Sequence, residues 1–255
     1  MGPGHAASIA TAEERGMEKV LVELIEKLKD AAGANLKSVV LYGSAVTGEF
    51  AAGRSDLNVL CIVERSGAVQ LEALRPAVAW WMRQRQAAPL VFTIDELRRS
   101  ADIFAIELLD IVANHRTLYG DDHFLNFEVP TWLHRLQVER ELRTNWVRLR
   151  RAVLAAPAKN RELLVLMTDS ISSFATLFRH ALLGMGEAPP RSMREAIEGA
   201  AQLVGGDPAP FLTVLEARDG KRKVAEIDVE AVLHGYLELV ELITDEVDRR
   251  FQPRR

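Results

Sequence analysis

The chain has 255 residues, of which 48% are hydrophobic and 27% are charged, a globular balance that suffices for two modest cores. Its net charge of -4 excludes the basic field that sequence-independent nucleic-acid binding requires, so we expect no nucleic-acid partner. No apolar stretch approaches the roughly 20 residues of a membrane span, and the single cysteine, Cys61, excludes an intrachain disulfide. These features predict a cytoplasmic protein without a membrane partner.

The N-terminal segment 1–10 lacks the basic and apolar regions of a secretion signal, and we expect it to form a tail. Thr11-Ala12-Glu13-Glu14 is typical of a helix capping box, and apolar residues then repeat at helical spacing as far as Gly33. We therefore place a first domain at 11–129 and expect it to open with this helix.

Two apolar runs follow this helix, and polar residues stand between them. The first run, Val39 to Tyr42, stops at Gly43 and Ser44, and the second begins directly after Asp56 and includes Asn58. This pattern predicts a strand, a phosphate-binding turn and a second strand. Gly43 allows a phosphate to approach the backbone closely, and Ser44 can donate its hydroxyl. Side chains alternate along a strand, so Asp56 and Asn58 are expected to share one face.

These residues resemble the active-site core of the nucleotidyltransferase superfamily, the fold of polymerase beta. The resemblance implies a nucleoside triphosphate (NTP) as substrate, Mg2+ as cofactor, and transfer of a nucleoside monophosphate to a hydroxyl of a small-molecule or protein acceptor. It implies Asp56 and Asn58 as catalytic residues and metal ligands. It also implies Gly43, Ser44 and Ser55 as nucleotide-binding residues.

The superfamily carries Asp-x-Asp or Asp-x-Glu where this chain has Asp56-Leu57-Asn58. A two-metal site needs several converging carboxylates, and an Asn side chain offers only a neutral carbonyl oxygen. We therefore expect metal-dependent transfer to be impaired. The alternative is a catalytically inactive regulatory protein that binds a nucleotide or a protein partner.

A third metal ligand would come from a later strand, predicted near 90–93. The position expected for that acid holds Thr93, and Asp95 stands two residues on, where it could share the same face. We therefore predict Asp95 as a third candidate ligand for Mg2+. In the alternative interpretation, Asp95 is the N-terminal acid of a helix that begins at Glu96. Glu107 is a further acid, for which a surface position is favoured.

From Thr131 onward the pattern changes to long amphipathic helices, and we place a second domain, a helical bundle, at 130–255. The fold class is an α/β (α+β) nucleotidyltransferase domain with a small mixed sheet, followed by an all-α bundle. This layout resembles the kanamycin-type nucleotidyltransferases. The aromatic residues at the join, Phe124 and Phe127, favour burial where the two halves meet. The sequence leaves an oligomer open.

Overall fold

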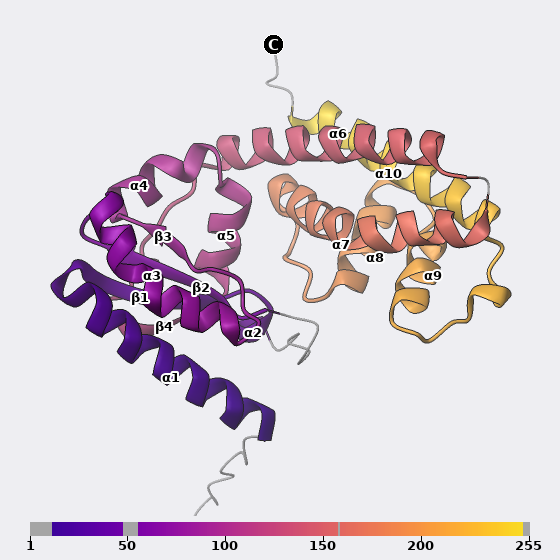
Figure 1. Ribbon diagram of the computed structural model, residues 1–255. Helices are drawn as coiled ribbons and strands as arrows, with labels where there is room; N and C mark the ends of the chain where they lie inside the picture. Colours follow the sequence, from indigo (N-terminus) through magenta and orange to yellow (C-terminus); the bar gives the residue numbers. More distant parts are fainter. Residues whose placement is uncertain (1–11, 48–55, 158, 252–255) are drawn as a thin grey trace, which may run out of the picture. The chain divides into compact units, whose positions relative to one another are not determined.

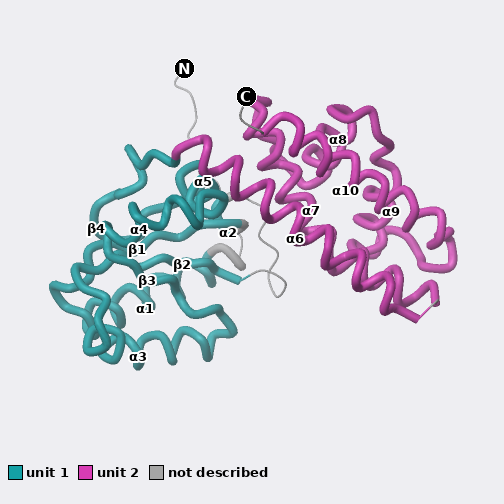
Figure 2. Tube along the Cα trace, turned by 90° about the horizontal axis from the view of Figure 1, so that it is seen from above, with its two compact units in different colours: residues 1–129 teal, residues 130–255 magenta. Residues whose placement is uncertain are grey.

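The computed structural model describes residues 12–47, 56–157 and 159–251, so the predicted tail at 1–10 lies outside the described residues. Two compact units make up the chain, Met1–Val129 and Pro130–Arg255 (Figure 2). Within the described ranges, no helix is both long and apolar enough to cross a bilayer.

The first unit combines helices with a 4-stranded sheet. Its elements, in chain order, are α1 (Ala12–Ala32), the 3-10 turn η1 (Gly33–Asn35), β1 (Leu36–Tyr42), α2 (Ser44–Thr47), β2 (Asn58–Val63), α3 (Ala68–Arg83), β3 (Leu90–Phe92), α4 (Ile94–Arg99), the 3-10 turn η2 (Ser100–Asp102), α5 (Ala105–Ala113) and β4 (His115–Gly120) (Figure 1).

The strands lie in the order β3-β2-β1-β4 and form the predicted mixed sheet. Strand β1 runs antiparallel to β2 and to β4, whereas β2 and β3 are parallel. A parallel pair needs a long crossover connection, which α3 supplies. In this register Tyr42 pairs with Asn58 on one side and with His115 on the other. These three residues therefore form a row across the sheet, directly before the turn at Gly43.

Helices cover both faces of the sheet (Figure 1). On one face, α1 and α3 bury Leu24, Leu28 and Trp81 against the strands. On the other face, α4 and α5 contribute Leu97 and Ile111 to a second apolar cluster. Because the side chains of β1 and β2 alternate between two apolar layers, both strands are nearly continuous apolar runs in the sequence.

The predicted third strand ends one residue earlier than expected. Strand β3 stops at Phe92, and Thr93 is the N-cap of α4. The Thr93 hydroxyl oxygen accepts a hydrogen bond from the backbone N–H of Glu96 at 3.1 Å, and the Glu96 carboxylate accepts one from the N–H of Thr93 at 2.8 Å. This reciprocal capping box starts the helix at Ile94, so Asp95 lies in the first helical turn. The structure thus agrees with the helix interpretation of Asp95.

The aromatic residues at the join pack within the first unit. Phe124 is fully buried in the apolar cluster under α4 and α5, and Phe127 packs against the same cluster. The two rings lie 5.7 Å apart. Every residue of this cluster belongs to the first unit, so the burial of these aromatic side chains needs no contact between the halves.

The second unit is helical throughout its regular elements, as predicted. They are α6 (Thr131–Ala155), α7 (Asn160–Met185), α8 (Met193–Val204), α9 (Ala209–Arg218), the 3-10 turn η3 (Val224–Glu226) and α10 (Val229–Phe251). An aromatic group fills its centre, where the Phe211 and Tyr236 rings stack 3.8 Å apart. The Tyr236 hydroxyl shares a hydrogen bond of 2.9 Å with Ser170. This packing joins α7, α9 and α10 in one core.

Candidate nucleotide site

The turn after β1 has a conformation that favours glycine. Gly43 has a φ of 77°, in the left-handed region, and a Cβ at this position would lie 2.8 Å from the side-chain nitrogen of Asn58. The Asn58 amide therefore lies directly against the backbone of Gly43. The residue that follows β1 and the first residue of β2, which are 15 positions apart in the sequence, meet here.

Asn58 is available to a ligand at this junction. Its side chain is half-buried and makes no hydrogen bond with any residue in the described part of the chain. An amide offers both a donor and an acceptor, so it can bind a phosphate oxygen through its NH2 group. Strand pairing with Tyr42 fixes its backbone.

Asp56 lies two residues before the start of β2, and it is exposed. The adjoining backbone is held in place, because the N–H of Leu57 donates to the side-chain oxygen of Gln86 at 2.7 Å. Trp81 strengthens this connection by donating from its indole nitrogen to the carbonyl of Ala87 at 2.8 Å. The α3–β3 connection thus supports the segment that carries Asp56.

Two predicted nucleotide-binding residues are not defined by the structure. Ser55 lies outside the described residues. The backbone of Ser44 begins the short helix α2, and the N–H of Val46 donates to the carbonyl of Gly43 at 2.9 Å. The side chain of Ser44 is likewise outside the described part. Both residues therefore stay predictions.

The structure does not bring Asp95 to this junction. In the parallel register, Ile62 pairs with Phe92, so Asp95 follows the end of β2 opposite to Asn58. Four residues of strand separate Asn58 from Ile62, which amounts to about 13 Å at the usual rise per residue. Asp95 is also exposed on α4. The structure therefore places Asp95 away from Asn58, and its role as a ligand for Mg2+ stays a prediction.

Glu107 is an acid whose charge acts on Tyr42, one of the three residues in the row of Tyr42, Asn58 and His115. Burial raises the pKa of the Tyr42 hydroxyl, and the negative charge of Glu107 raises it further. The Glu107 side chain on α5 is exposed, as predicted, yet its charge contributes to the raised pKa of Tyr42. Since α5 follows η2 closely and packs on the sheet, the fold rather than the sequence spacing produces this proximity.

The donors at the junction do not fit a pair of Mg2+ ions. Within the described ranges, no group of three or more His, Cys, Asp or Glu side chains could hold a metal ion. Asp56 supplies a charged oxygen and Asn58 a neutral one, whereas divalent magnesium prefers carboxylate and phosphate oxygens in octahedral geometry. The described residues thus supply one charged and one neutral oxygen, and the metal site that the resemblance implied stays a prediction.

His115 is a residue of this region that the sequence did not single out. Its Nδ1 lies 2.8 Å from the carbonyl oxygen of Ile111, and its Nε2 lies 3.0 Å from the carboxylate of Asp122. Hydrogen bonds from the N–H of Phe124 and from His115 outweigh the loss of water around Asp122 and lower the pKa of that carboxyl. The sequence held one signal for this pair: His115 begins the last strand of the sheet, and two aspartates follow directly after Gly120.

No protein-family model and no curated protein matches the sequence. Among solved structures, the chain is similar to spectinomycin adenyltransferase AAD(9) from Enterococcus faecialis, crystallised with ATP and spectinomycin. The TM-score is 0.56 at 12% sequence identity, and the match covers 88% of this chain and 99% of that chain. The likeness shows the fold: a small mixed sheet covered by helices and followed by a helical part, as in that adenyltransferase. At this identity the likeness shows the fold alone.

Proposed function

We propose that the chain binds a nucleoside triphosphate at the turn after β1 and is a nucleotidyltransferase whose transfer step is slow or absent. The observation that carries this proposal is the junction of Gly43 with Asn58, two residues after Asp56. The Asn58 amide lies against the Gly43 backbone there and makes no hydrogen bond with any described residue. The shared fold with an adenyltransferase crystallised with ATP supports it.

We propose that each residue of the junction has a separate role in binding the nucleotide. Gly43 lets the Asn58 amide lie against its backbone, because a Cβ at this position would lie 2.8 Å from the amide nitrogen. The NH2 group of Asn58 can donate to a phosphate oxygen, and we propose that the hydroxyls of Ser44 and Ser55 add further donors. Asp56 remains the charged residue of the motif and the natural first ligand for any divalent cation that accompanies the nucleotide.

The weakness of the site lies in its charge. A unit charge about 4 Å from an ion contributes roughly 4 kcal/mol at an effective dielectric constant near 20, and the amide of Asn58 carries none. A metal ion can stabilise the charge on the phosphates during nucleotidyl transfer. We therefore propose that a divalent cation binds weakly here and that transfer to an acceptor is limited by this loss.

The acceptor that we propose is a hydroxyl group of a small molecule. The similar adenyltransferase was crystallised with spectinomycin, a compound that can serve as one probe. We also propose a cytoplasmic location, since the chain has one cysteine and so cannot form an intrachain disulfide.

A second candidate function is regulatory: the chain binds a nucleotide or a protein partner without catalysis. The observation that favours it is the absence of a metal-binding group of three or more ligands within the described ranges. The two candidates share nucleotide binding and differ in turnover, so one variant of the junction tests what they share.

The test is a calorimetric titration of ATP, with and without Mg2+, into the unmodified protein and into Gly43→Ala. We expect the variant to bind at least about tenfold more weakly, because its Cβ displaces the Asn58 amide and covers the phosphate approach. Gly33→Ala is the matched control, because Gly33 has a φ of 51° in the same unit with no atom within 4 Å of the added Cβ. Equal affinity in all three proteins would remove the turn from the site.

A further inference from the structure

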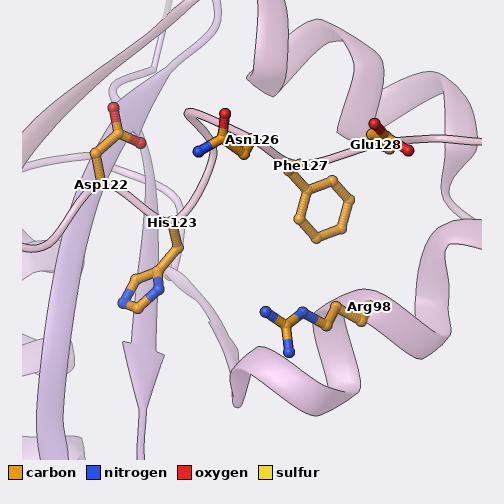
Figure 3. Close-up of a pocket in the computed structure, with 6 residues that line it drawn as sticks. All are labelled: Arg98, Asp122, His123, Asn126, Phe127 and Glu128. Atoms are coloured by element: carbon orange, nitrogen blue, oxygen red, sulfur yellow. The ribbon is translucent and has the colours of Figure 1, made fainter.

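A second concave site lies within the first unit, between α4 and the loop that follows β4. It is a pocket of about 410 Å³ lined by Arg98, Asp122, His123, Asn126, Phe127 and Glu128. Figure 3 shows the Phe127 ring projecting from the loop toward the Arg98 guanidinium, and Arg98 extending from α4 toward the side of the pocket where His123 lies. Pockets of this size accommodate small organic ligands.

The helix wall of this pocket is fixed in position. Leu97, next to Arg98, is almost fully buried, and the capping box of Thr93 and Glu96 holds the start of α4. The hydroxyl of Ser66 also donates to the Glu96 carboxylate at 2.8 Å, which ties α4 to the segment after β2. Arg98 therefore projects from a helix that is held at its core face and at its N-terminus.

The loop wall is fixed as well. Phe124 anchors it in the apolar cluster, and the backbone N–H of Phe124 donates to Asp122 at 2.9 Å. The N–H of Phe127 donates to the carbonyl of Phe124 at 3.1 Å. The ring of Phe127 is thereby presented to the pocket from a loop with its own internal hydrogen bonds.

The lining of the pocket combines the positive charge of Arg98 with the carboxylates of Asp122 and Glu128. Asp122 is already satisfied by His115 at 3.0 Å and by the N–H of Phe124, and in Figure 3 its carboxylate points away from the pocket. Arg98 and His123, by contrast, make no side-chain hydrogen bond or ion pair with any residue that the structure describes. Glu128 lies at the opposite end of the lining loop from His123.

We propose that this pocket binds a small aromatic anion, an aryl carboxylate or aryl phosphate, with its charged group on Arg98 and His123 and its ring against Phe127. Arg98 can form two parallel hydrogen bonds with a carboxylate or phosphate, which a lysine could not. Phe127 offers an aromatic face at the same site. Two aromatic rings in contact stabilise each other by more than the burial of their surface alone. The pocket does not include Gly43 or Asn58, so the proposal stands apart from nucleotide binding.

The test measures binding of phenyl phosphate, benzoate, inorganic phosphate and neutral benzamide to the full chain by calorimetry. We expect both aromatic anions to bind at least about fivefold more tightly than phosphate and benzamide, because each of those probes lacks one of the two features. Arg98→Gln should weaken binding of phenyl phosphate by about tenfold or more. Arg99→Gln is the matched control, since Arg99 is exposed on the same helix and does not line the pocket.

Gly43→Ala separates this site from the nucleotide site and should leave binding of phenyl phosphate unchanged. Loss of binding in Gly43→Ala with retention in Arg98→Gln would place the probe at the nucleotide turn and overturn the proposal. Equal weakening by Arg98→Gln and Arg99→Gln would show general attraction to positive charge and would also overturn it. If phosphate bound as tightly as phenyl phosphate, the role assigned to Phe127 would be wrong.

Discussion

At the residue scale, the function of the candidate site depends on one contact that joins two strands. The sequence indicated Gly43 and Asp56 from the residue types around the two apolar runs, and it indicated that Asn58 departs from the pattern. It could not indicate that the Asn58 amide lies against Gly43, because this contact follows from the antiparallel register of β1 and β2. Because of this contact, a substitution of Gly43 is expected to change the position of the Asn58 amide as well.

A second residue-scale feature lies in α10, where Glu246 accepts two hydrogen bonds from Arg249, at 2.8 and 2.6 Å. Arg250 donates to the same carboxylate. The hydrogen bond from Arg249 is the largest cause that lowers the pKa of Glu246 to about 2. A carboxyl whose pKa is lower in the folded state stabilises the fold above its unfolded pKa, near 4.5, and loses this effect as pH falls toward 2.

We therefore expect Glu246→Gln to lower the free energy of unfolding by about 1 kcal/mol at neutral pH, a modest value because the Arg249 side chain is 67% exposed and that of Arg250 is 37% exposed. The difference from the unmodified protein should shrink as the pH falls from 4.5 toward 2. Urea denaturation at several pH values measures it. Glu241→Gln is the control on the same helix, because Glu241 is exposed and forms no ion pair among the described residues. A difference that stays constant with pH would contradict this account.

At the element scale, the strands of the site were predictable because β1 and β2 are buried on both sides. Their apolar runs stop where the chain leaves the sheet, and the structure places both strand ends close to the predicted positions. The boundary between β3 and α4 was less predictable. Thr93 is a β-branched residue that suits a strand, yet it is also a good N-cap, and the reciprocal bond with Glu96 decides between the two.

The turn that ends β4 determines where the following loop can go. Gly120 has a φ of 75°, and a Cβ there would lie 1.8 Å from the carbonyl oxygen of Lys37 on β1. The loop then turns back so that Asp122 reaches His115 at the other end of the same strand. This return could not be read from the sequence, because it depends on a close approach between two backbones.

We expect Gly120→Ala to lower the free energy of unfolding by about 2 kcal/mol or more, because the strained backbone and a collision with another backbone add together. Gly186→Ala is the matched control: Gly186 has a φ of 89°, but nothing lies within 4 Å of the added Cβ. It should cost only the strain, about 1 kcal/mol. Chemical denaturation of both variants gives the comparison, and equal losses would contradict the role of the Lys37 contact.

At the scale of the whole molecule, the two units were visible in the sequence as a change from strand-forming runs to long amphipathic helices. The packing of Phe124 and Phe127 at the join could not be predicted, because the sequence does not reveal which core an aromatic side chain enters. Phe124 and Phe127 complete the core of the first unit. The organisation of the first unit therefore differs from one in which these side chains bridge the two halves.

We expect a fragment of residues 1–129 to fold by itself and to unfold in one cooperative transition, because both of its apolar clusters consist of its own residues. Near-ultraviolet circular dichroism should show fixed surroundings for Trp80 and Trp81 in the fragment. A fragment that aggregates, or that lacks a cooperative transition, would show that the helical unit is required for its stability.

The most direct test of the central claim compares nucleotidyl transfer by the unmodified protein and by Asn58→Asp, with labelled ATP, Mg2+ and a hydroxyl acceptor such as spectinomycin. The account predicts slow or undetectable transfer by the unmodified chain. It predicts tighter binding of Mg2+ by the variant, about tenfold or more, since the new carboxylate restores the missing charge beside Asp56. Rapid Mg2+-dependent transfer by the unmodified protein, unchanged in Asn58→Asp, would contradict the claim that Asn58 limits this site.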